Sequence, residues 1–125
     1  MALVLDAGAL IAVDRHDRAV GALLRVAQRD QIPVRTSAAV VAQVWRDGVR
    51  QQNLARVLSG VDAAPLTAPI GRRVGVLLGR SRTSDVVDGH VGLIVREDDT
   101  VLTSDPDDLT GILRARAIRA TVRTV

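Results

Sequence analysis

The sequence contains no cysteine, so it can form no disulfide, cysteine-ligated zinc site, iron–sulfur cluster or thiol nucleophile. With only two histidines, a metal ion would have to be held mainly by oxygen atoms. Lysine is absent too, which excludes Schiff-base chemistry and the P-loop lysine of nucleotide-binding proteins. Phenylalanine and tyrosine are also missing and there is one tryptophan, Trp45, so a row of aromatic side chains for stacking nucleobases is excluded.

The charges that are present have an unusual composition. All 17 basic residues are arginine, and the 14 acidic residues are aspartate apart from Glu97, for a net charge of +3. A guanidinium group can bind a phosphate through two parallel hydrogen bonds. The composition therefore favours a phosphate-bearing partner over a cationic one.

The length and hydrophobic content indicate one globular domain over residues 1–125. A chain of 125 residues lies within the usual size of a single domain, and 47% hydrophobic residues are enough for a core. No apolar run approaches the ~18 residues of a membrane span, and no basic leader precedes the apolar Leu3. We therefore expect a cytoplasmic protein without a membrane partner.

Short apolar runs alternate with segments of helical periodicity along the chain. The predicted strands cover residues 3–5, 32–34, 61–66, 100–103 and 117–122. The predicted helices cover residues 9–13, 17–30, 37–48, 49–58, 70–78, 85–95 and 107–114, with Gly79 ending the fifth. This alternation predicts an α/β fold of three layers, with about five parallel strands covered by helices on both faces.

Four aspartates occupy positions where a parallel α/β sheet binds its ligands. Asp6 and Asp105 each follow a predicted strand, and Asp85 and Asp88 lie in the first turn of a predicted helix. Each of them alone is also consistent with a helix cap. Ligands of such sheets bind beyond the carboxyl ends of the strands, where several carboxylates repel one another unless a divalent cation neutralises them.

The pattern resembles the four motifs of the PIN-domain ribonucleases, and in particular the VapC-type toxins of bacterial toxin–antitoxin pairs. The matching segments are LVLDAGALIA at 3–12, VAQV at 41–44, DVVDGHV at 85–91 and VLTSD at 101–105. The resemblance implies a PIN-like fold and metal-dependent cleavage of RNA phosphodiester bonds. It also implies a cognate antitoxin and a homodimer.

By this resemblance, Asp6, Asp88 and Asp105 are catalytic residues and ligands of Mg²⁺ or Mn²⁺. Thr103 and Ser104 are expected beside the metal site. Such a cation polarises the phosphoryl oxygen and activates a water, so the reaction needs no side-chain nucleophile.

The second motif departs from the family. The usual glutamate of the central helix is replaced by Gln43, which can still orient a water but removes one negative charge. Asp85 restores that charge if it is a metal ligand, and does not if it is only a helix cap. The alternative to an active ribonuclease is therefore a catalytically degenerate PIN-like module that binds RNA or a protein partner.

An acidic crevice repels RNA, so a basic rim is needed to bring the strand to it. The predicted RNA contacts are Arg15, Arg18, Arg46 and Arg82. Trp45 is predicted to lie in the core beside Val41 and Val44, and His90 is predicted to serve packing or to lie on the surface.

Two other α/β families fit less well. A haloacid-dehalogenase-like phosphatase has a second aspartate two residues after the first, where this chain has Gly8. A dinucleotide-binding domain needs a glycine-rich turn after the first strand, and the segment at 6–10 lacks one.

Overall fold

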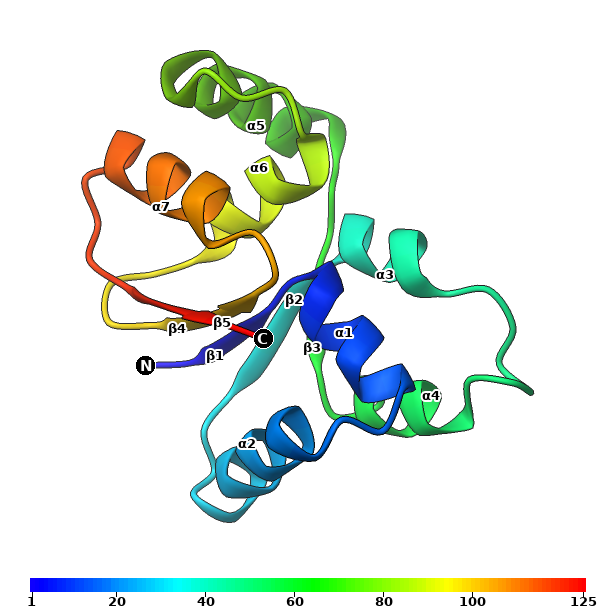
Figure 1. The fold of residues 1–125 in the computed structure, drawn as a ribbon. Coiled ribbons are helices and arrows are strands. Elements are labelled where there is room, and N and C mark those ends of the chain that lie inside the picture. Colours follow the sequence, from blue (N-terminus) through cyan, green and yellow to red (C-terminus); the bar gives the residue numbers. More distant parts are fainter.

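The computed structural model describes residues 1–125 and contains one five-stranded parallel sheet with seven helices (Figure 1). The strands are β1 (Leu3–Leu5), β2 (Val34–Ser37), β3 (Asp62–Ala64), β4 (Thr100–Thr103) and β5 (Thr121–Thr124). The helices are α1 (Ala7–Asp14), α2 (Arg18–Arg29), α3 (Ala38–Val44), α4 (Gln52–Leu58), α5 (Ala68–Ser81), α6 (Val86–Ile94) and α7 (Pro106–Ala115). None of these helices has the length and apolar character needed to cross a membrane.

The strand order is β3-β2-β1-β4-β5, and every neighbouring pair is parallel. The chain moves from β1 outward to β3, and then crosses back to β4 and β5. Because crossovers between parallel strands are right-handed, the two directions place their helices on opposite faces. Figure 1 shows α1 to α4 on one face and α5 to α7 on the other, which confirms the predicted three-layer fold.

The two central strands form the middle of the core. Val4 and Leu5 of β1 and Val101 and Leu102 of β4 are completely buried. Strands covered on both faces are apolar on both faces, which explains why these runs show no alternation with polar residues. The core fixes β1 beside β4 and thereby aligns their carboxyl ends.

The carboxyl ends of β1 and β4 lie at the switch point of the topology. From β1 the chain turns to α1 on one face, and from β4 it turns to α7 on the other. Open α/β sheets bind their ligands at such a point, because the two connections diverge there. Asp6 and Asp105 occupy the N-cap positions of α1 and α7, directly beside it.

A buried ion pair closes the opposite, amino end of the strands. Arg35 of β2 donates to Asp99 Oδ2 at 2.5 Å, and Asp99 also accepts hydrogen bonds from the backbone N–H groups of Ala2 and Arg96. In the structure Asp99 anchors β1, β2 and the α6–β4 loop to one another.

Two predicted strand boundaries are wrong. We predicted the second strand at 32–34, but β2 runs from Val34 to Ser37. The polar Thr36 can lie inside the sheet because its hydroxyl donates a hydrogen bond to Leu5 O at 2.7 Å. We predicted the last strand from 117, but Ala117 has a φ of 55° and its N–H ends α7 by bonding Arg114 O. The chain becomes a strand only at Thr121.

Several helix boundaries also differ from the prediction. Gly79 does not end α5, which continues to Ser81 and stops at Arg82 with a φ of 58°. The predicted helices at 37–48 and 49–58 are shorter than expected, since α3 ends at Val44 and α4 begins at Gln52. The intervening residues form a loop held by hydrogen bonds from the Gln51 side chain.

Candidate active site

Asp6 is the most enclosed carboxylate of the crevice. Its side chain is 3% exposed, and its Oδ1 accepts a hydrogen bond from Ala9 N at 3.2 Å, which caps α1. Burial raises the pKa of Asp6, the hydrogen bond from Thr103 lowers it, and the charge of Asp105 raises it further. The carboxylate thus serves as a helix cap and also faces a second acid.

Thr103 connects Asp6 with Asp105. Its completely buried hydroxyl donates to Asp6 Oδ2 and accepts the backbone N–H of Asp105 at 2.8 Å. This places Thr103 beside the candidate site, as the motif predicted. Asp105 itself is exposed and makes no side-chain cap to α7, so its carboxylate is free for another role.

Asp88 reaches the same crevice from α6. It is 7% exposed, and its pKa is raised to about 7. Burial is the largest cause, followed by the charges of Asp85, Asp105, Asp6 and Asp108. Carboxylates from three separate elements therefore lie near enough to oppose one another's ionisation.

Asp108, which the motifs did not include, also raises the pKa of Asp88. It lies in the first turn of α7 and its charge acts on Asp88 across the crevice. The sequence signal that could have identified Asp108 was its position three residues after Asp105, in the first turn of the same helix.

Asp85 caps its own helix. Its Oδ1 accepts the backbone N–H of Asp88 at 3.0 Å, as the cap alternative for this residue expects. The reason is local, since an aspartate before a helix satisfies an otherwise unpaired N–H. Its charge nevertheless raises the pKa of Asp88, and its role as a metal ligand stays a prediction.

Gln43 lies in the last turn of α3. Its side chain is exposed and makes no hydrogen bond to any of the aspartates. Its assignment as the water-orienting residue therefore rests on the motif and stays a prediction.

A close approach between Gly8 and Ser104 narrows the crevice at one end. A Cβ atom at position 8 would lie 2.7 Å from Ser104 Cβ and 3.0 Å from Ser104 N. Real atoms do not sit so close, so only glycine lets the β4–α7 loop pack on the start of α1. Ser104 itself is exposed beside the site.

The donor set suits a hard divalent cation, because Asp6, Asp88 and Asp105 offer only oxygen and their crowding opposes their ionisation. As the side chains lie, no three His, Asp or Glu residues are gathered into a complete ligand group. The metal-binding role of these residues and of Asp85 stays a prediction.

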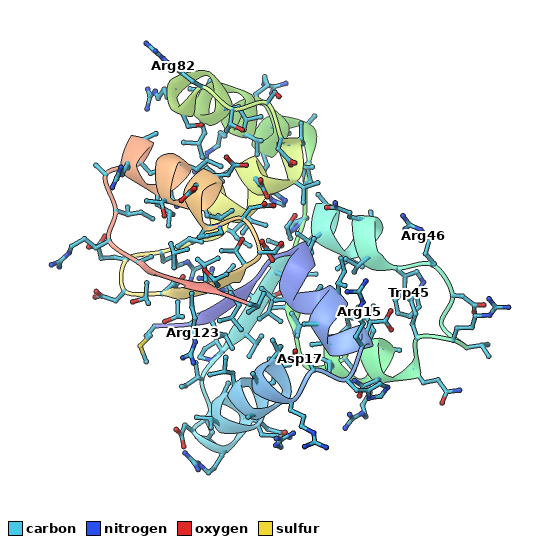
Figure 2. All side chains as sticks on the ribbon, in the orientation of Figure 1. Arg15, Asp17, Trp45, Arg46, Arg82 and Arg123 are labelled. Carbon is cyan, nitrogen blue, oxygen red and sulfur yellow. The ribbon has the colours of Figure 1, made fainter.

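The four arginines predicted to form a rim are all exposed, but they do not form one group. Figure 2 shows Arg15 and Arg46 on the same side of the molecule, near Trp45, while Arg82 projects from the far end of α5. Arg18 lines a separate cavity of about 650 Å³ between α2 and α4, together with Asn53. The four arginines therefore do not form one continuous binding surface for RNA.

His90 is completely buried, which confirms a packing role. Its Nδ1 lies 2.5 Å from Ser37 Oγ. Either group can donate in this bond, depending on the tautomer of the imidazole, and a neutral imidazole can take either role. Burial lowers the pKa of His90, in keeping with that state. The pair ties α6 to the start of α3.

Comparisons with known proteins agree with this fold. A scan of the sequence against protein-family models finds no match, and a search of curated proteins finds none either. Among solved structures, the chain is similar to a chain in the crystal structure of VapBC2 from Rickettsia felis bound to a DNA fragment from their promoter. The TM-score is 0.65 at 14% sequence identity, covering 100% of this chain and 99% of that chain. The match confirms the PIN-like fold that the motifs predicted.

Proposed function

We propose that this protein is a Mg²⁺- or Mn²⁺-dependent endoribonuclease, and the toxin of a toxin–antitoxin pair. The observation that carries the proposal is that Asp6 and Asp105 follow the two central strands and are linked through Thr103, with the buried Asp88 close enough for their charges to raise its pKa. Repulsion among carboxylates from three elements destabilises the fold, and a bound divalent cation would remove that repulsion.

In this proposal Asp6 and Asp105 bind the cation directly, while Asp88 binds it through water or binds a second cation. A cation held there polarises the phosphoryl oxygen and supplies an activated water. Thr103 holds the Asp6 carboxylate in one orientation and fixes the backbone of Asp105. Gln43 offers an amide oxygen that can orient the attacking water.

The proposal includes a protein partner. The similar structure is of VapBC2, a toxin–antitoxin assembly, and its likeness to this chain supports a cognate antitoxin here. A cytoplasmic homodimer that cleaves RNA is the form we propose for the free toxin.

One observation favours a second candidate. Gln43 removes a charge from the usual set and is not hydrogen-bonded to the acids, which fits a PIN-like module that binds RNA or a partner without cleaving it. The two candidates differ in whether a divalent cation is required.

The test is cleavage of defined RNAs by purified protein with Mn²⁺, with Mg²⁺ and in excess chelator. We expect cleavage only with the cations, and its loss in Asp6→Asn and in Asp105→Asn. The matched control is Asp62→Asn, which removes an exposed aspartate of β3 that has no hydrogen-bond partner and no coupling to the crevice. Cleavage that persists in chelator contradicts the mechanism, and RNA binding without cleavage under all conditions favours the second candidate.

A further inference from the structure

Trp45, the only aromatic residue of the chain, lies at the surface. We predicted it in the core, but α3 ends one residue earlier and 36% of the Trp45 surface is exposed. Helical periodicity misled the prediction, because the backbone at Trp45 is already extended, with φ −75° and ψ 133°. A large apolar side chain exposed in this way costs free energy that burial would have recovered.

The loop that presents Trp45 is held in one conformation by Gln51. The Gln51 Oε1 accepts the backbone N–H groups of Arg46 at 2.7 Å and Asp47 at 3.0 Å. Its Nε2 donates to Val44 O at 2.9 Å and to Asp14 Oδ2 at 3.2 Å. One side chain thus ties the loop to the end of α3 and to α1.

A glycine then fits the loop against the indole. A Cβ atom at Gly48 would lie 3.1 Å from Trp45 Cζ2, so the backbone there packs directly on the benzo ring. The ring is supported on this side, and the exposed 36% of Trp45 faces solvent from a fixed position.

Arg15 and Arg46, on the same side of the molecule as Trp45 (Figure 2), have no carboxylate partner. Neither arginine forms an ion pair, although four other arginines of the chain do. Arg46 Nη1 donates to Ala42 O at 3.2 Å and to Trp45 O at 2.6 Å, which orients its guanidinium and leaves the remaining N–H groups free.

We propose that Trp45 stacks on a nucleobase of single-stranded RNA while Arg46 and Arg15 bind the flanking phosphates. An exposed indole beside unpaired guanidiniums matches the alternation of base and phosphate along a strand. The exposed apolar surface of this loop consists of Trp45 and Val49, which is too small for a stable protein interface. Any base can stack, so this contact selects single strands rather than a sequence.

The position of Trp45 ties it to the crevice. The seven-residue α3 begins at the carboxyl end of β2 and ends beside Trp45, a length of about 10 Å. Gln43, on the same helix, precedes Trp45 by two residues. A strand held at Trp45 therefore continues toward the acidic crevice, and this inference rests on the proposed RNA substrate.

The sequence offers a direct probe of this contact. With one tryptophan and no tyrosine, the intrinsic fluorescence of the native protein reports Trp45 alone. We would titrate metal-free protein in chelator at low salt with a short single-stranded oligoribonucleotide, and separately with an abasic sugar-phosphate chain of equal length. We expect saturable quenching by the first and none by the second. No quenching, or equal quenching by both, overturns the proposal.

Labelled-RNA anisotropy with variants completes the test. Trp45→Leu should weaken binding about tenfold, while Trp45→Phe keeps a stacking face and most of the affinity. Val49→Ala is the matched control, since Val49 is a 77% exposed apolar residue of the same loop. Unchanged affinity in Trp45→Leu overturns the proposal, and the folded Trp45→Phe variant decides the case if Trp45→Leu unfolds.

The two proposals fail separately. If RNA is not cleaved with any cation but quenching is observed in chelator, the nuclease proposal fails and this one holds. If Trp45→Leu cleaves single-stranded RNA with an unchanged KM, the nuclease proposal holds and this one is contradicted.

Discussion

Thr103 and Asp6 are joined by a buried hydrogen bond that links the carboxyl end of β4 to that of β1. The Thr103 hydroxyl donates to Asp6 Oδ2, and the same hydroxyl oxygen accepts the Asp105 N–H at 2.8 Å. Since a hydroxyl has one proton to donate, the two bonds fix its direction. One threonine therefore sets the relation between the two acids that end the central strands.

Removing the Thr103 hydroxyl should loosen this relation. In Thr103→Val the Asp6 carboxylate loses a hydrogen bond that lowers its pKa, and we expect the protein to lose about 2 kcal/mol of stability at pH 8. The loss should be smaller at pH 4, because a protonated carboxyl bonds more weakly. Urea unfolding at both pH values measures this. Thr103→Ser keeps the hydroxyl and should stay within about 0.5–1 kcal/mol of the native protein; an equal loss in both variants would assign the effect to packing.

The raised pKa of Asp88 predicts how stability depends on pH. Between its ordinary value of 3.8 and about 7, the folded protein keeps a proton that the unfolded chain has lost. The stability of the metal-free protein should therefore fall as pH rises through this range. Asp88→Asn should flatten the profile and stabilise the protein at pH 8 by about 1 kcal/mol or more. Thermal melts in chelator test this, and a variant less stable than native at pH 8 would mean that the carboxylate is structurally required.

Gly8 is predicted to control the spacing of the crevice. Gly8→Ala adds a methyl group where Ser104 already lies, so the β4–α7 loop must move away from α1 and carry Asp105 with it. We expect Mn²⁺ affinity to fall about tenfold or more. Gly71→Ala is the control, because no heavy atom lies within 4 Å of the added methyl group. Equal Mn²⁺ affinity in the two variants would show that the spacing set by Gly8 does not affect metal binding.

The missing charge at Gln43 can be tested through Asp85. Asp85→Asn should keep the helix cap, with a cost of about 0.5 kcal/mol or less, because asparagine caps nearly as well as aspartate. If its charge supports the site, Mn²⁺ affinity should fall in Asp85→Asn and recover when Gln43→Glu is added. Calorimetric titration of the four proteins of this cycle measures the coupling, and strict additivity would show that Asp85 does not compensate for Gln43.

The parts of the fold that were predicted correctly are those where local pattern and tertiary structure agree. In a protein of this size, the apolar runs at Leu3–Leu5 and Val101–Leu102 can be buried at few positions other than the centre of a sheet. Asp6 and Asp85 cap the helices that follow them, as their positions allow, because a cap depends only on nearby residues. The strand order then places Asp6 and Asp105 at the switch point of the sheet.

The errors in the predicted element boundaries and burial arise where contacts with other elements determine the structure. Arg35, Thr36 and Ser37 look too polar for a buried strand, yet each is satisfied by a partner far away in the chain. Trp45 continues an apolar helical face, but the hydrogen bonds of Gln51 end the helix first. Neither outcome is visible in a window of sequence, because the partner lies in another element.

The most direct test of the account is calorimetric titration of Mn²⁺ into the metal-free native protein at pH 7, in buffers of different ionisation enthalpy. The account predicts saturable binding with proton release, since Asp88, with a pKa of about 7, must lose its proton when the cation binds. Proton release should diminish at pH 8.5, and binding should be lost in Asp6→Asn and Asp105→Asn. Absence of binding in the native protein, or binding that both variants retain, would contradict the claim that these carboxylates form a cation site.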